Sequence, residues 1–404
     1  MTFAELWAEL LPVGRDEFTG GYRRYSWTTA DAACRAWFAR TATQLGLRTD
    51  CDRNGNLWAW WGRPGRMQAV VTGSHLDSVP DGGAYDGPLG VVSAFAAVSQ
   101  LRSDGFRPAR PIGVAAFTEE EGARFGVACL GSRLLTGAIT PEAASALRDG
   151  DGVALADAMA AAGRDASGIG PDEDLLAGIG AFVELHIEQG KALADLGAAI
   201  GVADGIWPHG RWRFDFAGRA DHAGTTRLAD RQDPMLPYAA TVLAARTSAE
   251  RCGALATFAK VVAEPGAANA ISSRVQAWLD ARAPDEATLD LLVSQVSTAA
   301  AAAAGQHGVA VRQHRESVTP PVSFDRGLRD RLAAVLAAAG IAAPLVPTGA
   351  GHDAGVLAAR IPAGMLFVRN LSGVSHSPAE HAEMADCETG VAALAAVLAD
   401  LAAQ

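Results

Sequence analysis

Short apolar runs alternate with helical patterns along the first part of the chain. Apolar and β-branched residues dominate at 57–61, 69–72, 112–117 and 182–187, which predicts short buried strands. Apolar residues recur at helical spacing over 28–45, 89–101, 141–147 and 155–162. Strands that alternate with helices predict an α/β fold with a mixed, largely parallel sheet and helices on both faces.

After Trp207 the pattern changes. The segment "RWRFDFAG" at 211–218 alternates like a half-exposed strand, 234–249 has a helical pattern, and 256–264 and 274–282 predict two further strands. An alanine-rich helix at 285–304 and a strand at 308–314 complete the order β-α-β-β-α-β, which is the split βαβ, or ferredoxin-like, arrangement. From 324 the earlier alternation resumes, with an apolar strand at 365–368 and a last helix from about 388. We therefore predict a discontinuous domain, 1–209 with 323–404, and an inserted α+β domain at 210–322.

Composition agrees with this organisation. The length of 404 residues favours two domains, since single hydrophobic cores stop growing at about 250–300 residues. The net charge of −11 argues against a nucleic-acid partner, because phosphate binding requires clustered Lys and Arg. Five scattered cysteines without CxxC spacing fit a reducing cytoplasm. The acidic start "MTFAELWAEL" and the shortness of the longest alanine run, 299–304, predict neither export nor insertion into a membrane.

Metal-binding residue types follow four predicted strands, at the edge where open α/β sheets form their binding crevices. The segments are "GSHLDSVPDGGAYDGPLG" (73–90), "FTEEEGARFG" (117–126), "FVELHIEQG" (182–190) and "SGVSHSPAEH" (372–381). They supply His75, His186 and His376 as imidazole donors and Asp86 and Glu121 as carboxylates. First-row divalent metals take such ligands, and two ions can share one bridging carboxylate and an activated water.

Each of these residues also has a structural explanation when it is taken alone. Asp86 precedes a glycine in a turn-like segment, His186 fits a hydrogen-bonded core histidine, and the acidic run 119–121 fits a solvated surface. Their joint occurrence after strands favours a metal centre, with Glu120 as a base that does not need to touch the metal.

The chain resembles the zinc-dependent aminoacylase and carboxypeptidase (peptidase M20-type) superfamily, and within it the amidase, hydantoinase and carbamoylase group. Seven motifs occur in the order of that group: "GSHLDSVPDGGAYDGPLG", "EEEGARFG", "ELHIEQG", "DHAGTTRLADRQDP", "NAISSRVQAWLDAR", "GAGHDA" and "GVSHSPAEH". The resemblance implies a phosphorylase/hydrolase-like catalytic domain of the di-zinc exopeptidase type, with the inserted domain as a lid and dimerisation domain. It also implies two divalent metal ions per subunit (Zn or Mn, with Co as a further candidate), a cytoplasmic homodimer and a small anionic ureido substrate.

The resemblance assigns roles around the two ions. Asp86 would bridge them, and Glu120 would act as the general base and then as the acid. Asp77 would orient the imidazole of His75 from behind the metal ligands. The remaining ligands divide into His75 and His186 at one ion, and Glu121 and His376 at the other.

The resemblance also assigns substrate contacts. His222 would stabilise the oxyanion at the partner subunit's site, and Asn269 and Arg282 would hold the substrate, Arg282 by a bidentate contact with its carboxylate. Gln189 and Gly351 are weaker candidates for substrate contacts. Local explanations remain for two of these residues: His222 could close a turn before a glycine, and Arg282 could pair with a neighbouring aspartate.

The function implied is hydrolysis of the ureido C–N bond of allantoate, with release of ammonia and CO2. The alternative is an N-carbamoyl-L-amino-acid hydrolase, followed by an N-acyl- or N-formyl-amino-acid deacylase or a dipeptidase on the same fold. A non-catalytic dimeric binding protein is the rival from another class. The chain departs from the family pattern at Arg227, Ser272 and Arg369, and the two added guanidinium groups would suit a different or second carboxylate near an anion site.

Overall fold

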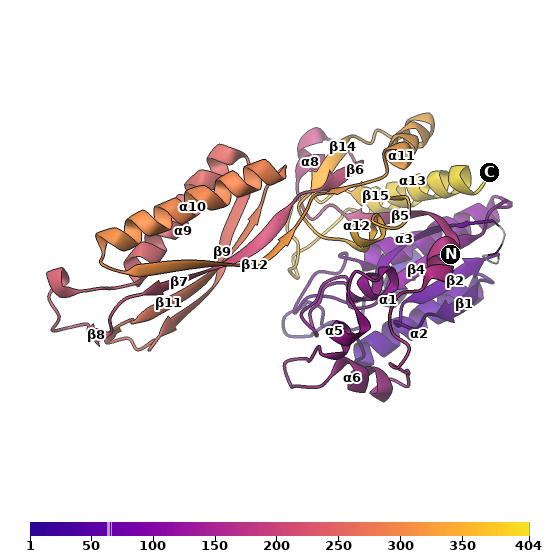
Figure 1. Cartoon of the computed structure of the whole chain (residues 1–404). Helices are drawn as coiled ribbons and strands as arrows, with labels where there is room; N and C mark the ends of the chain where they lie inside the picture. The colour runs from indigo at the N-terminus through magenta and orange to yellow at the C-terminus, as the bar shows by residue number, and fades with distance from the viewer. Residues whose placement is uncertain (63–64, 66, 404) are drawn as a thin grey trace. The chain divides into compact units, whose positions relative to one another are not determined.

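The computed structural model describes residues 1–62, 65 and 67–403, and these form two compact units (Figure 1). Unit 1 comprises Met1–Gly205 and Ser323–Gln404, and unit 2 comprises Ile206–Val322. Chain segments far apart in sequence therefore build unit 1, whereas unit 2 is continuous.

Unit 1 is built on a nine-stranded mixed sheet in the order β1-β2-β4-β3-β5-β15-β6-β13, with β14 paired to β6. The four central strands β4, β3, β5 and β15 run parallel, whereas β1, β2 and β6 pair antiparallel with their neighbours. The strands are β1 (Arg48–Cys51), β2 (Leu57–Trp61), β3 (Ala69–His75), β4 (Ile112–Phe117), β5 (Ile179–Ile187), β6 (Ile200–Ile206), β13 (Val322–Ser323), β14 (Leu345–Thr348) and β15 (Ala363–Val368).

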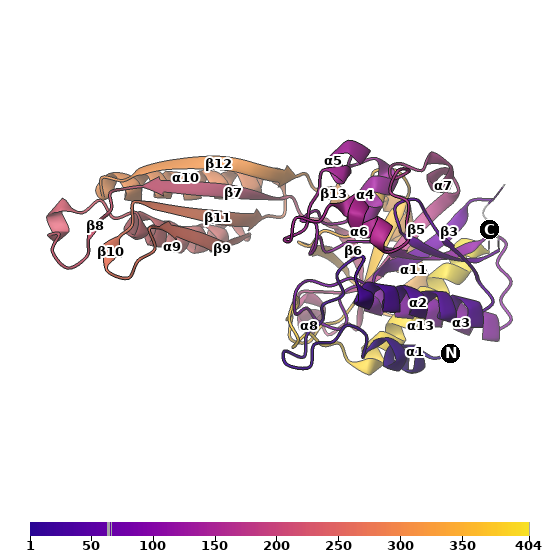
Figure 2. The same cartoon turned by 90° about the horizontal axis from the view of Figure 1, so that it is seen from below.

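Helices cover both faces of this sheet (Figure 2). One face carries α1 (Phe3–Leu10), α2 (Thr29–Gln44), α3 (Pro88–Ser103), α11 (Arg326–Ala338) and α13 (Met384–Ala402). The other carries α4 (Leu130–Thr136), α5 (Pro141–Ser145), α6 (Leu155–Ala161), α7 (Glu173–Ala177) and α12 (Asp353–Leu357), and the short α8 (Ala192–Leu196) follows β5. The predicted mixed, largely parallel sheet is confirmed.

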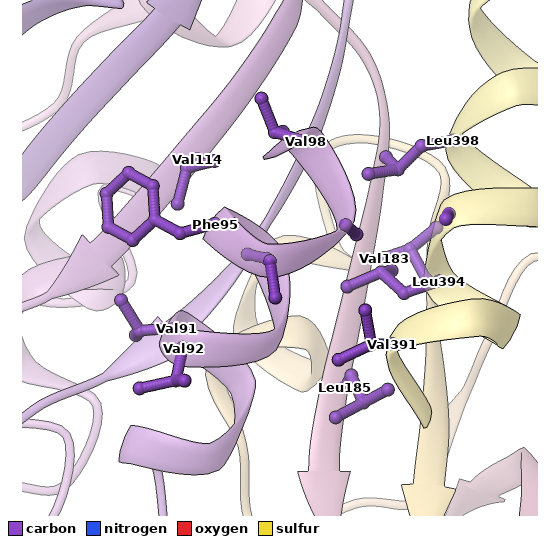
Figure 3. Packing of buried hydrophobic residues seen from close by; sticks show 14 of the residues in the cluster. Val91, Val92, Phe95, Val98, Val114, Val183, Leu185, Val391, Leu394 and Leu398 are labelled. Atoms are coloured by element: carbon purple, nitrogen blue, oxygen red, sulfur yellow. The ribbon is translucent and has the colours of Figure 1, made fainter. Parts of the chain in front are cut away.

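The main core of unit 1 lies between the sheet and the pair α3 and α13. Helix α3 is apolar nearly all round and buried along almost its whole length, as expected for a helix enclosed between a sheet and a second helix. Figure 3 shows this packing, with side chains from four elements: Val91, Val92, Phe95 and Val98 of α3, Val114 of β4, Val183 and Leu185 of β5, and Val391, Leu394 and Leu398 of α13. This core fixes the strands whose ends carry the candidate site.

Unit 2 has the order β7-α9-β9-β11-α10-β12 around a four-stranded antiparallel sheet ordered β12-β7-β11-β9. Its elements are β7 (His209–Ala217), β8 (Asp221–His222), the 3₁₀ turn η1 (Leu228–Asp230), α9 (Met235–Cys252), β9 (Leu255–Glu264), β10 (Ala270–Ile271), β11 (Arg274–Arg282), α10 (Glu286–Gln306) and β12 (Ala310–Thr319). Alternate residues of β11, including Val275 and Leu279, are buried under α9 and α10. Of the described helices, α10 alone has the length and apolar composition of a membrane span, and its Leu292 and Val296 lie in this core.

Several predicted boundaries were wrong. The strand expected at 69–72 continues to His75, because Gly73 and Ser74 still pair with β4 although they read as the start of a loop. The strand expected at 308–314 runs to Thr319, where polar side chains lie on an exposed strand. The last helix begins at Met384 rather than at about 388.

Candidate metal centre

The four parallel strands deliver the candidate ligands to one edge of the sheet. His75 is the last residue of β3, His186 lies near the end of β5, Glu121 follows β4, and His376 follows β15. Strand pairing places His75 opposite Phe117 of β4 and His186 opposite Phe367 of β15. The carboxyl ends of adjacent parallel strands meet at the same edge, so these side chains converge.

Asp86 reaches this edge from the loop between β3 and α3. Its two carboxylate oxygens face different imidazoles: Oδ1 lies 3.4 Å from Nε2 of His75 and 3.2 Å from Nε2 of His186, whereas Oδ2 lies 3.2 Å from Nε2 of His376. Two donor groups result, one of His75, Asp86 and His186 and one of Asp86, Glu121 and His376, each with its ligand atoms within 4.8 Å of one another. Asp86 is the member common to both groups.

The local sequence accounts for the position of Asp86. Gly87 adopts a left-handed conformation (φ +83°), and Pro88 starts α3 directly after it. A Cβ at residue 87 would overlap the imidazole ring of His75. A side chain at this position would therefore push the loop away from β3.

Two imidazoles are oriented so that one nitrogen has no hydrogen-bond partner. Nδ1 of His75 lies 3.1 Å from the carbonyl oxygen of Asp77, and Nδ1 of His186 lies 2.8 Å from the carbonyl oxygen of Ile187. Nε2 of both histidines is buried and has no hydrogen-bond partner among the described residues. A buried, unpaired nitrogen that faces carboxylate oxygens fits a divalent cation, which would supply the missing partner.

The electrostatics of the site favour a cation as well. Burial lowers the pKa of His75, but the charge of Glu120 and the nearby carboxylates of Asp77 and Asp86 raise it well above its ordinary value. Burial disfavours the ionised form of Asp86, yet the adjacent imidazoles of His186 and His376 hold the pKa of this carboxyl well below its usual range. The hydrogen bond to Asp86 raises the pKa of His376 to about 9. A surplus of buried carboxylates that attracts protons would attract a divalent ion in the same way.

Asp77 supports both sides of the site. Its carboxylate lies 3.5 Å from Nδ1 of His75 and accepts the backbone N–H groups of Glu120 and Glu121 at 3.2 and 3.0 Å. The side chain therefore orients the His75 imidazole and also fixes the turn after β4. The second of these contacts could not be seen in the sequence.

Glu120 lies beside the donor groups and belongs to neither of them. Its Oε2 is 3.8 Å from Nε2 of His75, and its Oε1 accepts from the thiol of Cys129 at 3.1 Å. Burial raises the pKa of Glu120 well above its ordinary value. Burial, and then the charge of Asp86, raises the pKa of Glu121 to about 7. Glu120 is thus a carboxyl group next to the donors that is available for proton transfer.

The remaining candidates divide between the two units. In unit 1, Nε2 of Gln189 donates to Oδ2 of Asp86 at 2.7 Å, so this side chain directly contacts a candidate metal ligand. Gly351 lies exposed in the loop before α12. In unit 2, His222 and Asn269 are neighbours, since the Ala223 N–H donates to the Asn269 carbonyl at 3.0 Å.

Two local explanations from the sequence describe real contacts. The N–H of Gly224 donates to Nδ1 of His222 at 3.0 Å, and Nε of Arg282 donates to Oδ1 of Asp280 at 2.8 Å. The Arg282 guanidinium thus has an anionic partner within its own strand.

Both added arginines pair with carboxylates of the same chain. Arg369 makes two hydrogen bonds with the Asp386 carboxylate, at 2.8 and 2.9 Å, and Arg227 pairs with Asp230 at 2.6 Å. These pairs give each guanidinium an anionic partner in the absence of substrate, and the expectation that the two groups suit a second substrate carboxylate stays a prediction.

Three buried residues of this region were not among the ligands, catalytic residues or substrate contacts proposed from the sequence. Glu184 accepts from the Ser74 hydroxyl and from the Ala354 N–H. Nε2 of His352 is buried next to His186 and has no hydrogen-bond partner in the described part of the chain. Glu380 contacts the loops of Asp86 and His376. All three stand in motifs that were recognised, so their place in "ELHIEQG", "GAGHDA" and "SPAEH" was the available signal.

The sequence pattern of peptidase family M20/M25/M40 matches residues 71–400. The chain belongs to this family. It is 35% identical over 393 residues, 96% of each chain, to a protein from Geobacillus stearothermophilus named N-carbamoyl-L-amino acid amidohydrolase. It is 32% identical to the ureidoglycolate hydrolase of Arabidopsis thaliana, over 94% of this chain and 82% of that protein, and 31% identical to the allantoate amidohydrolase of Escherichia coli, over 95% and 94%.

Solved structures agree with this assignment. A hydantoinase/carbamoylase family amidase from Burkholderia ambifaria superimposes with a TM-score of 0.87 at 31% identity, over 100% of this chain and 98% of that one. This member of the M20/M25/M40 family is accordingly an amidohydrolase, and it has residues suited to metal binding at the edge of its sheet.

Proposed function

We propose that this chain is a metal-dependent amidohydrolase that cleaves the ureido C–N bond of a small anionic substrate, with allantoate as the first candidate. The observation that carries the proposal is the position of Asp86, which belongs to both donor groups and turns one oxygen toward the histidines of each. Glu120 belongs to neither group and lies 3.8 Å from His75. Such a set provides for two ions, for which Zn or Mn are the first candidates and Co the next, and for a separate general base.

The names of the relatives support the substrate class. N-carbamoyl-L-amino acids, ureidoglycolate and allantoate all carry a ureido group on a carbon atom that also bears a carboxylate. A site for this class must therefore hold a carboxylate and place the neighbouring ureido carbonyl at the reactive centre. The relative at 35% identity specifically favours N-carbamoyl-L-amino acids as the second candidate substrates.

The residues of unit 1 divide the chemistry between them. Divalent ions held by the two donor groups would lower the pKa of a bound water and polarise the ureido carbonyl. Glu120 takes a proton from the attacking water and then delivers it to the departing nitrogen, so that ammonia leaves when the C–N bond breaks. The carbamic acid that remains loses CO2 and leaves the amine product.

We assign the substrate contacts to Gln189 and Gly351 in unit 1 and to His222, Asn269 and Arg282 in unit 2. Because Nδ1 of His222 accepts a hydrogen bond from Gly224, the neutral ring carries its proton on Nε2 and can donate it to an oxyanion. Arg282 would exchange Asp280 for the substrate carboxylate, which suits a planar, bidentate donor. Unit 2 would also be the surface through which two chains associate as a homodimer.

A substrate panel tests the proposal. The metal-free chain is reconstituted with Zn or Mn and assayed for ammonia or amine release from allantoate, ureidoglycolate, N-carbamoyl-L-amino acids, N-formyl amino acids and dipeptides. We expect the highest kcat/KM with a ureido substrate, and allantoate first among them. Preference for the N-formyl compounds or dipeptides would contradict the ureido assignment, and a chain that binds no divalent metal would contradict the enzyme mechanism.

A further inference from the structure

Glu380 joins two loops that are far apart in the sequence. Its side chain is buried, and Oε1 accepts the backbone N–H groups of Tyr85 and Asp86 at 3.0 and 2.9 Å. Its other oxygen, Oε2, accepts the hydroxyl of Ser375 at 3.0 Å. One carboxylate therefore binds the backbone of the Asp86 loop and the residue directly before His376.

Without Glu380, the N–H groups of Tyr85 and Asp86 lose the one acceptor that they have among the described residues, and the Ser375 hydroxyl keeps only Oδ2 of Asp86, at 3.4 Å. The N–H groups of Tyr85 and Asp86 are buried, and a buried donor without an acceptor carries the full cost of its desolvation. His376 adopts a left-handed backbone conformation (φ +53°), which a residue with a Cβ keeps only when its surroundings hold it. The contact with Ser375 is one of the constraints next to this strained residue.

Gly83 packs directly against the side chain of Glu380. A Cβ at residue 83 would lie 2.5 Å from both Cβ and Cδ of Glu380 and would also overlap Oε1. The φ of Gly83 is not in the left-handed region, so an alanine here tests space alone. The glycine leaves just enough room for the carboxylate to reach the two N–H groups.

We propose that Glu380 is a positioning residue that holds Asp86 and His376 at the mutual distance needed for the second donor group. The proposal rests on the proposed function, because it concerns the metal ions of that site. Glu380 acts through the backbone of Asp86 and the side chain of Ser375, and it belongs to neither donor group. The group of His75 and His186 is less dependent on it, since both histidines stand on β3 and β5. Loss of Glu380 should therefore weaken the ion at Glu121 and His376 more than the other.

The experiment compares E380A with E380Q and G83A, and uses E383A as the control. Glu383 is an exposed carboxylate of the same segment, and its side chain forms an ion pair with His381 on the surface. The glutamine of E380Q can still accept the two N–H groups and can donate to Ser375, whereas G83A displaces an intact Glu380. Metal content is measured after dialysis against graded chelator, and hydrogen exchange of the Tyr85 and Asp86 amides is measured in the metal-free protein.

We expect E380A and G83A to lose affinity for one of two ions by at least tenfold, with faster exchange at Tyr85 and Asp86. E380Q and E383A should stay within about threefold of wild type. Two ions held at wild-type affinity by E380A and G83A, or unchanged exchange at the two amides, would overturn the positioning role. Failure of the wild-type chain to bind any divalent ion would instead contradict the proposed function, and the hydrogen-exchange comparison, which needs no metal, would still decide whether Glu380 holds the loop.

Discussion

Replacement of Glu120 by glutamine separates proton transfer from metal binding. The substitution keeps the size of the side chain and an oxygen that can accept the hydrogen bond from Cys129, now at 3.1 Å. It removes the second carboxylate oxygen and with it the ability to take up a proton at neutral pH. Glu120 belongs to neither donor group, so the metal content of the variant should equal that of wild type.

The size of the expected loss follows from the role of the residue. A positioned general acid-base group contributes about 10²–10⁴-fold to a rate, which corresponds to ~3–5 kcal/mol of activation free energy. Oε2 of Glu120 is only 3.8 Å from Nε2 of His75, so the carboxyl group is within reach of a water beside the donors. We therefore expect kcat to fall by about 10²–10⁴-fold with little change in KM.

The assay is steady-state ammonia release from the best substrate of the panel, together with metal analysis of the same samples. E383Q, a change at an exposed carboxylate away from the donors, serves as the matched control and should retain wild-type kcat. A kcat of E120Q near that of wild type would refute the assignment of Glu120 as the base. Loss of both ions in E120Q would show instead that Glu120 is a ligand.

Four further predictions concern the metal ions, the substrate and the core. H186A should lower the affinity for one ion by at least about tenfold, measured by chelator competition, because it removes one donor of the buried group. Metal affinity should rise with pH: a proton on Glu121, whose pKa is about 7, or on His376, whose pKa is about 9, must leave before either group coordinates. Below pH 7 the metal affinity should therefore fall by on the order of tenfold per pH unit for each proton displaced. Isothermal titration with the metal ion at pH 6 and pH 8 measures this difference, and equal affinities at the two pH values would contradict the reasoning. R282K should raise KM for carboxylate substrates by on the order of 10–100-fold, because the ammonium cannot reproduce a bidentate contact; an unchanged KM would remove Arg282 from substrate binding. F95A should lower the free energy of unfolding by ~3–5 kcal/mol in urea denaturation, since Phe95 is fully buried against Trp37 and Phe38; a loss below about 1 kcal/mol would mean that the core refills the space.

Local sequence was enough to predict β2 and the four parallel strands of unit 1, with the residues that follow them, but not β1, β6, β13 and β14. The apolar runs at 112–117 and 365–368 are short and continuous because strands buried on both faces need no polar side, and both form strands. His75 and His186 could be proposed as ligands because strand ends in such sheets share one edge, and the structure brings their Nε2 atoms to the same oxygen of Asp86. Boundaries were less certain, because a glycine such as Gly73 reads as a turn unless the partner strand is known.

The sequence by itself determined the family, the type of sheet and the set of candidate ligands, since these depend on residue types and their order along the chain. Only the tertiary structure decided how Asp86 divides its two oxygens between the donor groups, that Arg369 is neutralised by Asp386, and that Glu380 binds the backbone of a loop 294 residues away. The physical reason is the range of the interactions. Hydrophobic periodicity and turn chemistry act over a few residues, whereas a hydrogen bond across the end of a sheet depends on which strands become neighbours, and no short segment encodes that order.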